Sequence, residues 1–170
     1  MAHEVPRIFT APSIRAIMAG HKTQTRRIAH EDESLRYDVG DHFWAKETLV
    51  RARSPASRVA VSFGAFYAAT GTPVAAANGE SPATWMWSRT TLSPIFMPRW
   101  ACRLVLELTA MRVEALHAIT TADAIAEGMT GDYPIDGYAQ AWDAINARRA
   151  PEAKWEHNPR VRVLTFKVVG

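Results

Sequence analysis

The N-terminal part of the chain combines a short helical pattern with a strand pattern. Ile14, Ile17 and Met18 recur at helical spacing, and Thr10 and Gly20 stand where an N-cap and a left-handed C-cap belong. This predicts a helix between Thr10 and Gly20. An extended segment at 7–9 precedes it, and the β-branched residues of 23–28 predict a strand that leaves it.

A second strand is predicted over 42–50, HFWAKETLV, where side chains alternate between two faces. Phe43, Ala45, Glu47 and Leu49 fall on one of these faces, after a turn signal at Gly40-Asp41. Because Glu47 is charged, this face is not purely apolar.

The C-terminal half predicts three more strands. The alternating leucines of 102–109 and the segment 111–115 predict two strands joined by a hairpin or a close bend. The segment 160–169 is the strongest strand pattern of the chain, and Asn158-Pro159 ends whatever precedes it.

Two helices are predicted between these strands. Thr120 followed by Asp123 predicts a capped helix that ends at Gly128. Asp136 predicts the cap of a second helix, which would carry Ala139, Trp142 and Ile145 along one stripe.

The segment from 51 to about 95 is rich in Ala, Ser, Gly, Pro and Thr and breaks the pattern. We expect it to be an irregular insertion, with one short strand near 63–69 and an aromatic group at Trp85 and Trp87. The whole order, β-α-β-β-β-β-α-α-β, predicts a single α+β domain over 1–170, built around a small, strongly curved β-sheet or β-barrel with flanking helices.

Composition narrows the class of protein. With 48% hydrophobic residues and six tryptophans, the chain is typical of globular proteins. The net charge of +3, mostly from arginine, permits a nucleotide-like or polyanionic partner without requiring one. A single cysteine excludes a disulfide within the chain, and no apolar run is long enough for a signal peptide or a membrane helix. We therefore expect a soluble, cytoplasmic protein without a membrane partner.

Several motif classes are missing from the sequence. There is no HExxH and no zinc-deaminase signature, and neither a P-loop, a dinucleotide-binding fingerprint nor a GxSxG motif occurs. We expect no metal and no cofactor. What remains is acid–base or nucleophilic chemistry by side chains.

Lys22 and Thr25 in GHKTQTRR are the best local pair for such chemistry. A threonine hydroxyl becomes a nucleophile when a base takes its proton, and a lysine can be that base if burial lowers its pKa. The alternative is that Lys22 caps helix carbonyl groups and Thr25 is an ordinary strand residue.

Two carboxylates are further candidates. Glu127 lies in the last turn of its predicted helix, where the partial negative charge of the helix end disfavours a carboxylate. That position suggests a role other than helix stability, although an exposed, screened Glu127 is the alternative. Glu47 shares a predicted strand with Trp44 and Lys46, and an exposed cross-strand ion pair would also explain it.

The tryptophans and Arg99 have two interpretations. A stacking surface for a base could form from Trp44, Trp85, Trp87, Arg99 and Trp100, or the tryptophans could belong to the core.

These motifs, in this order, resemble a known family. GxKTxTxR with Gly20, Lys22, Thr25 and Arg27, GDxxW from Gly40, an EGM helix end and the closing strand VLTFKVV resemble the ASCH domains, which are relatives of the PUA fold. With AKET, MPRWACR and a Trp-containing helix near the end, the pattern is similar to the longer ASCH-like proteins of phages and prophages. The resemblance spans nearly all of the chain except 51 to about 95.

The resemblance implies a small β-barrel with flanking helices and an amidohydrolase activity. Some small ASCH proteins remove the acyl group from N4-acetylcytidine with a Lys, Thr and Glu set, which maps onto Lys22, Thr25 and Glu127. Either Thr25 attacks the acyl carbonyl or it orients an attacking water. The expected partner is a small modified pyrimidine nucleoside, and the substrate-binding residues would be Arg27, Trp44, Glu47, Arg99 and Trp100.

The same family implies an alternative function. ASCH domains have also been regarded as RNA-binding modules, and some are reported to cut RNA. In that case Lys22, Arg26, Arg27 and Arg99 would bind phosphate and the tryptophans would stack on bases. A broad basic face would favour this alternative, whereas a small closed pocket favours the amidohydrolase.

Overall fold

The structure is a computed structural model that describes residues 2–30, 37–53, 63–75, 77 and 89–170. Eight strands lie in these residues: β1 Glu4–Ile8, β2 Gln24–Ile28, β3 His42–Lys46, β4 Leu49–Arg53, β5 Phe63–Tyr67, β6 Thr91–Leu92, β7 Val105–Ala115 and β8 Arg160–Val168. The α-helices are α1 Ala11–Met18, α2 Thr121–Ala126 and α3 Pro134–Asn146. The 3₁₀ turns are η2 Pro94–Phe96, η3 Arg99–Ala101, η4 Leu116–Ala118, η5 Pro151–Ala153 and η6 Trp155–His157.

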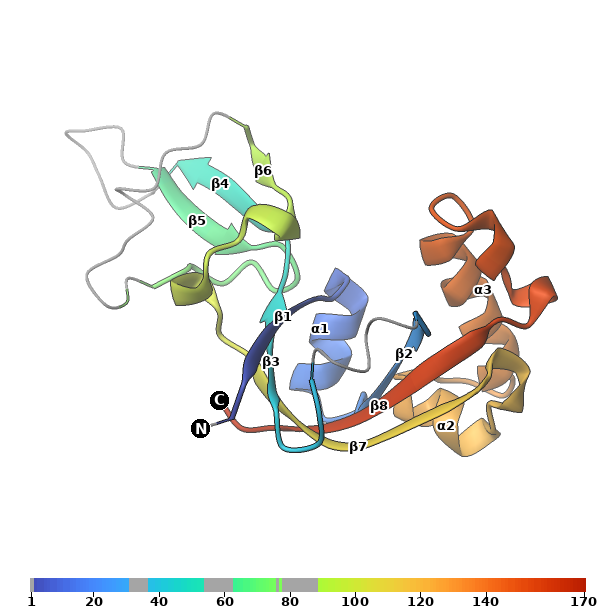
Figure 1. The fold of residues 1–170 in the computed structure, drawn as a ribbon. Coiled ribbons are helices and arrows are strands. Elements are labelled where there is room, and N and C mark those ends of the chain that lie inside the picture. Colours follow the sequence, from blue (N-terminus) through green and yellow to red (C-terminus); the bar gives the residue numbers. More distant parts are fainter. Residues whose placement is uncertain (1, 31–36, 54–62, 76, 78–88) are drawn as a thin grey trace.

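The main sheet has the strand order β1-β3-β7-β8-β2 and is mixed, because β1 runs parallel to β3 and the other pairs are antiparallel. The long strands β7 and β8 form a curved pair along the lower edge of the view in Figure 1, and α1 lies over their concave side. The helices α2 and α3 lie at the end where β7 stops and β8 starts (Figure 1). This is an α+β arrangement around a strongly curved sheet, which confirms the fold class expected from the sequence.

The caps at both ends of α1 agree with the sequence prediction. The Thr10 hydroxyl accepts a hydrogen bond from the amide of Ser13, and Gly20 follows the helix with φ of 74°. The strand β2 begins four residues later and pairs with β8, with Thr25 opposite Leu164 and Arg27 opposite Arg162. The capped helix therefore delivers the chain directly to the edge strand that carries Thr25.

The strand predicted over 42–50 is divided in the structure. His42–Lys46 belongs to the main sheet as β3, and Leu49–Arg53 belongs to a second sheet as β4. The alternation persists through the break, since Phe43, Ala45, Glu47 and Leu49 are all buried. Alternation alone cannot reveal that the chain changes sheets between two buried positions.

The segment expected to be irregular contains strands in its described residues. β4 pairs with β5 and β6 in a three-stranded antiparallel sheet of order β5-β4-β6, and the predicted strand near 63–69 is confirmed as β5. A separate hydrophobic cluster that includes Leu49, Tyr67, Met97 and Ala101 packs beneath it. The expected aromatic group at Trp85 and Trp87 lies outside the described residues.

The hairpin predicted between 102–109 and 111–115 is wrong. Both segments belong to the single long strand β7, which pairs with β8 and has a β-bulge between Leu108 and Ala110. The Thr109 hydroxyl donates to the Thr165 carbonyl at this irregularity. No Gly, Pro, Asn or Asp stands between 105 and 115 to turn the chain. The shift in the alternation of apolar and polar side chains near 109 therefore reflects a β-bulge and not a turn.

The helix α2 has the capping box predicted from Thr120 and Asp123, with both reciprocal hydrogen bonds formed. The helix α3 starts earlier than predicted, at Pro134, and Asp136 lies in its first turn rather than at its cap. Its buried residues are Pro134, Tyr138 and Trp142, whereas Ile145 is exposed. The apolar stripe of α3 is thus rotated from the predicted one toward Tyr138.

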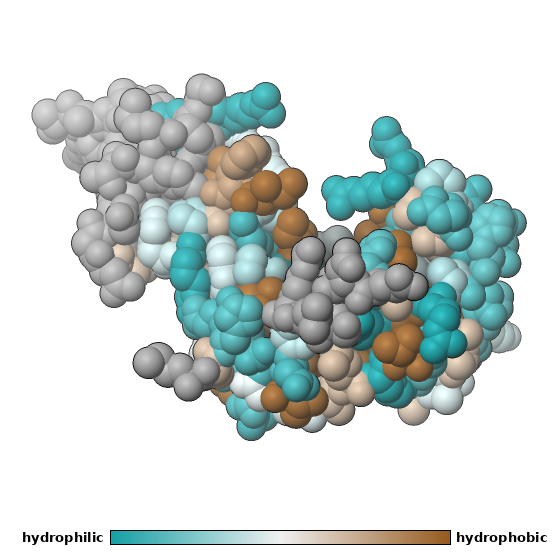
Figure 2. All heavy atoms as spheres, viewed as in Figure 1, coloured by the Kyte–Doolittle hydropathy of each residue, from teal (hydrophilic) through white to brown (hydrophobic). Residues whose placement is uncertain are grey.

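In the described part of the chain, no helix is both long and apolar enough to cross a membrane. The surface seen in Figure 2 is mostly hydrophilic, with separate hydrophobic patches.

Candidate active site

Lys22 and Glu127 meet where β2 begins and α2 ends. The Lys22 ammonium lies 2.6 Å from Oε2 of Glu127 and donates a second hydrogen bond, of 2.9 Å, to the carbonyl oxygen of the same residue. The two residues also form an isolated antiparallel β-bridge. Both side chains are buried, with 5% and 4% of each residue exposed. The buried Lys22 ammonium therefore holds the Glu127 carboxylate, which the partial negative charge at the end of its own helix disfavours.

Gly128 allows this close approach. Its φ of 92° is in the left-handed region, and a Cβ at this position would lie 3.1 Å from Cβ of Ala16 and 3.3 Å from Cβ of Lys22. The residue after Glu127 therefore has to be glycine for both conformational and steric reasons. The end of α2 packs directly against α1 and the start of β2.

Arg26 holds the other oxygen of Glu127. Its Nη1 lies 3.3 Å from Glu127 Oε1 and 2.8 Å from Oε1 of Gln24, while Nη2 lies 2.9 Å from Glu114 Oε1 and 3.1 Å from Asp123 Oδ2. The Arg26 side chain is fully buried. Two cations thus share the Glu127 carboxylate, one on each oxygen.

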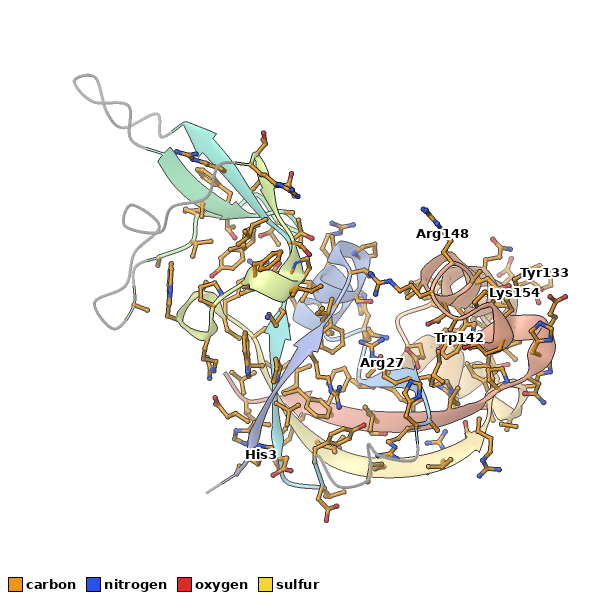
Figure 3. The ribbon with its side chains drawn as sticks, turned by 45° about the horizontal axis from the view of Figure 1, so that its top comes forward. His3, Arg27, Tyr133, Trp142, Arg148 and Lys154 are labelled. Carbon is orange, nitrogen blue, oxygen red and sulfur yellow. The ribbon has the colours of Figure 1, made fainter. Side chains whose placement is uncertain are left out.

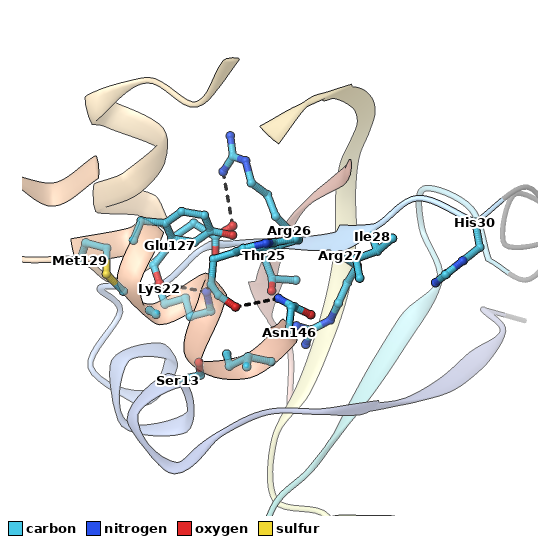
Figure 4. Close-up of a pocket in the computed structure, with 14 residues that line it drawn as sticks. Ser13, Lys22, Thr25, Arg26, Arg27, Ile28, His30, Glu127, Met129 and Asn146 are labelled. Carbon is cyan, nitrogen blue, oxygen red and sulfur yellow. Dashed lines mark hydrogen bonds and ion pairs between the residues drawn. The ribbon is translucent and has the colours of Figure 1, made fainter. Parts of the chain in front are cut away.

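A pocket with a volume of about 230 Å³ opens beside these side chains. Figure 4 shows β2 running along it, with Lys22 and Glu127 at one end, Thr25 and Arg27 in the middle and His30 at the other end. Thr25 is itself 4% exposed. The opposite wall comes from α3 and the turn before it, and consists of Met129, Tyr138, Ala141, Trp142, Ile145 and Asn146. Figure 3 places Arg27 on β2 and Trp142 on α3, on opposite sides of this space.

The environment of Lys22 favours loss of its proton. Burial lowers the pKa of Lys22, the nearby charges of Arg27 and Arg26 lower it further, and the Glu127 carboxylate acts in the opposite direction. The net pKa lies below the ordinary value of 10.5. On α3, burial and the negative charge of Glu127 raise the pKa of Tyr138 well above 10.0, so this hydroxyl stays protonated.

The two hydrogen bonds of Lys22 to Glu127 leave one further position on the Nζ atom that they do not use. A neutral amine has two N–H donors and a lone pair, and the two acceptors of Glu127 match those two donors. In the charged form the remaining position is a third N–H. The same geometry therefore suits Lys22 both as a proton acceptor and, after protonation, as a donor.

Four residues expected to bind substrate lie elsewhere in the described structure. Trp44 is on β3, with the Arg99 guanidinium 5.9 Å and the Lys46 ammonium 5.2 Å from its ring centroid. Arg99 forms a bidentate ion pair with Glu4, at 2.9 Å and 2.8 Å. None of these side chains lines the pocket beside Lys22.

Glu47 and Trp100 are also remote from this pocket. Glu47 is only 1% exposed and forms a bidentate ion pair with Arg103, at 2.8 Å and 2.9 Å, so the exposed pair that we considered is in fact buried. Arg103 in turn stacks 3.8 Å from the ring centroid of Tyr67. Trp100 packs against the cluster beneath the small sheet. A role of these residues in substrate binding stays a prediction.

The sequence does not predict the α3 residues of this site, and it predicts Arg26 only as a phosphate ligand in the RNA-binding alternative. The stripe containing Trp142 was recognised as apolar, but nothing in its spacing shows which element it faces. The direction of the Arg26 side chain can be predicted from the sequence. Arg26 lies between Thr25 and Arg27 in a predicted strand, so its side chain points to the face of the strand opposite to theirs. Its carboxylate partners come from β7 and α2, which are remote in sequence.

In the described residues, no group of three or more His, Cys, Asp or Glu side chains could hold a metal ion. The chemistry available at the pocket is a lysine, a hydroxyl and a carboxylate. Such a set can move a proton and activate an oxygen nucleophile.

Among the solved structures that resemble this one over almost its whole length are an ASCH domain and a protein of the family DUF984. The ASCH domain from Lactobacillus crispatus JV V101 matches with a TM-score of 0.53 and 13% identity, covering 98% of this chain and 79% of that chain. A protein from Enterococcus faecalis V583, described under the family DUF984, matches with a TM-score of 0.51 and 12% identity, covering 99% of this chain and 82% of that chain. No family model and no curated protein sequence matches the chain. At these identities the likeness shows the fold alone, which is that of ASCH domains.

Proposed function

From a fold shared with ASCH domains, we propose that this protein is a metal-independent amidohydrolase that removes the acyl group from N4-acylated cytosine nucleosides such as N4-acetylcytidine. The observation that carries the proposal is the buried Lys22–Glu127 pair, which lines one pocket together with Thr25. These are the three residues that the resemblance to acylcytidine hydrolases selects. Glu127 is remote in sequence from Lys22 and Thr25, and all three line the same pocket.

The first step forms a bond to the acyl carbonyl carbon. In one form of the reaction, Lys22 takes the proton of the Thr25 hydroxyl while Thr25 Oγ1 attacks the carbonyl. In the other form, Lys22 takes the proton of a water that Thr25 orients. Either nucleophile gives a tetrahedral intermediate with a negative oxygen, and the Arg27 guanidinium or backbone amides would stabilise that charge.

The second step breaks the carbon–nitrogen bond. Lys22, now protonated, returns its proton to the exocyclic N4 as the cytosine leaves, and Glu127 holds the ammonium in place through this transfer. If Thr25 was the nucleophile, a water then hydrolyses its ester and restores the hydroxyl. The products are cytidine and a carboxylic acid, with no external oxidant or metal.

The walls of the pocket support a nucleoside-sized ligand. The α3 side offers Trp142, Tyr138 and Met129 as apolar contacts, while the β2 side offers the polar groups. Ligand pockets commonly combine an apolar wall with a few polar groups that fix orientation. The volume of about 230 Å³ favours a single nucleoside over a polymer.

The alternative RNA-binding function receives less support from these residues. Two of the cations expected to bind phosphate, Lys22 and Arg26, are buried in ion pairs, and a third, Arg99, is paired with Glu4. Lys22, Arg26 and Arg27 line the pocket, but Lys22 and Arg26 are already paired there with Glu127. A broad basic face would need these groups at the surface.

The test is ultraviolet-monitored hydrolysis of N4-acetylcytidine by the wild type and by Lys22→Ala, Thr25→Ala and Glu127→Ala. We expect activity in the wild type and losses of about 10²–10⁴-fold in kcat for Lys22→Ala. Lys154→Ala, at an exposed lysine that is not among the residues lining the pocket, is the matched control and should keep full activity. An inactive wild type, or full activity in all three site variants, would contradict the proposal.

A further inference from the structure

Arg26 is a buried charged residue beside Glu127 that the proposed reaction does not use. Its side chain is fully buried and makes four contacts to oxygen atoms, and its guanidinium lies 5.9 Å from the ring centroid of Tyr138 in the pocket wall. Burying a guanidinium is costly unless it is paired and hydrogen-bonded. The pairing that compensates this cost includes the carboxylate of Glu127.

We propose that Arg26 is the permanent cationic partner of Glu127, and that it thereby leaves Lys22 as the cation of this pair that can give up its proton. This inference rests on the proposed function, in which Lys22 is the base. Arg26 is a positioning residue in this scheme, because it acts through Glu127 and not on the substrate.

Lys22 and Arg26 bind different oxygen atoms of the Glu127 carboxylate. Lys22 takes Oε2 at 2.6 Å and Arg26 takes Oε1 at 3.3 Å. An arginine cannot be deprotonated in a protein, whereas a buried lysine can. When Lys22 loses its proton, Glu127 therefore keeps one cationic partner, and no buried carboxylate is left without a counter-charge.

Arg26 is itself fixed from three other directions. Gln24 of β2 accepts from Nη1, and Glu114 of β7 and Asp123 of α2 face Nη2. Arg112 of β7 binds both of these carboxylates, at 2.7 Å and 2.9 Å. Arg26 is therefore held against Glu127 by a network that does not involve Lys22.

The other titratable groups around Lys22 come from two elements. Arg27 and His30 line the pocket from β2 and the residues after it, and Tyr138 of α3 faces Glu127 with its protonated hydroxyl. From α1, Ser13 and Ala16 approach without charge, while Arg15 donates to the Ala69 carbonyl instead. Glu127 is thus the carboxylate that faces Lys22 among these groups, and Arg26 is the cation that competes for it.

The experiment is a pH titration of lysine ¹³Cε signals, without substrate, in the wild type, Arg26→Gln, Arg26→Lys and Arg112→Gln. The wild-type chain has four lysines, at 22, 46, 154 and 167, and Lys22→Arg assigns the Lys22 signal. In Arg26→Lys, which adds a fifth lysine, the double variant with Lys22→Arg makes the same assignment. We expect the Lys22 midpoint to lie below the other three in the wild type and to rise by about one unit or more in Arg26→Gln. It should rise less in Arg26→Lys, because a buried lysine at 26 is a cation that can itself lose its proton. Arg112→Gln, which leaves the Arg26–Glu127 contact in place, should not move it.

Two results would overturn the proposed role of Arg26. A folded Arg26→Gln with an unchanged Lys22 midpoint overturns it, as does a wild-type Lys22 that titrates with the exposed lysines. If the amide spectrum of Arg26→Gln shows that it does not fold, the wild type and Arg26→Lys decide, because the midpoint must be low in the wild type and higher in Arg26→Lys. Since no substrate is present, inactivity toward N4-acetylcytidine would refute the proposed function without affecting this measurement.

Discussion

Lys22 and Glu127 lie 105 positions apart in the sequence, yet they form both a buried ion pair and an isolated backbone bridge. The ammonium binds the side chain and the backbone carbonyl of the same glutamate. The position of Lys22 is therefore fixed by the end of a helix, not only by a flexible carboxylate. This rigidity is what a proton acceptor needs in order to meet a reacting atom reproducibly.

Substitutions at Thr25 separate the two nucleophiles. If Thr25 Oγ1 attacks the carbonyl, Thr25→Ser should keep activity within about tenfold, whereas Thr25→Ala should lose about 10²–10⁴-fold in kcat. Rapid acid quench followed by mass spectrometry should then detect an acyl group on the peptide that contains Thr25. The absence of this adduct, together with substantial activity in Thr25→Ala, would instead identify water as the nucleophile.

The pH dependence of activity should follow Lys22. Burial lowers its pKa below 10.5, so the reactive, neutral amine forms at lower pH than in an exposed lysine. We expect kcat/KM to rise with pH and level off below the pH at which exposed lysines titrate. Steady-state kinetics from pH 5 to about pH 10 check this, and a rate that falls throughout this range would contradict the assignment of Lys22 as the base.

Gly128→Ala should disturb the site through the backbone. It combines a left-handed conformation with Cβ contacts of 3.1 Å to Ala16 and 3.3 Å to Lys22, so we expect a loss of about 1–3 kcal/mol in unfolding free energy and reduced activity. Gly131→Ala is the matched control, because Gly131 has the same φ of 92° but no atom within 4 Å of the added Cβ. Urea denaturation of both variants measures the difference, and equal losses would show that crowding at Gly128 is unimportant.

Glu47→Gln should change stability without changing catalysis. It breaks a buried bidentate pair with Arg103, for which we expect a loss of about 3–5 kcal/mol, while kcat/KM of the folded variant stays within about twofold. The exposed pair Glu107–Lys167, at 3.1 Å, supplies the control Glu107→Gln with a loss of at most about 1 kcal/mol. A selective rise in KM for Glu47→Gln would show that Glu47 binds substrate after all.

Asp123 should make the fold sensitive to acid. Burial acts to raise its pKa, but the Thr120 amide and hydroxyl, Arg112 and Arg26 outweigh burial and lower the pKa from 3.8 to about 2. Because the unfolded chain then binds the proton first, this stabilisation is present above the ordinary pKa and is lost as pH falls toward 2. In urea denaturation at pH 7 and at acid pH, Asp123→Asn should show a smaller acid-dependent loss than the wild type. Asp132→Asn, at an exposed position, should behave as the wild type.

Local signals in the sequence were sufficient for much of the fold. Thr10 and Thr120 marked helix starts because a cap depends on residues within one turn, and Gly20 and Gly128 marked ends because few residues other than glycine adopt positive φ. The hairpin in β7 was wrong because a bulge and a turn produce the same change of alternation over a few residues.

The candidate site, like the fold, could be predicted where the signal is local in sequence and not where it depends on distant residues. Lys22 and Thr25 could be selected because their spacing is local, and Glu127 because it conflicts with its helix end. The partners of Trp44, Glu47 and Arg99 could not be predicted, since Arg99 pairs with Glu4 and Glu47 with Arg103 across long sequence separations. Spacing selects residue types for chemistry, whereas tertiary packing decides which of them share one pocket.

The bridge between Lys22 and Glu127 also has a consequence for folding. It joins the start of β2 to the end of α2, so it closes only after the chain between them has been brought together, at a cost in loop entropy that local helices do not have. During refolding, helix formation should precede the appearance of catalytic turnover. Activity would then report the completion of the fold rather than its beginning.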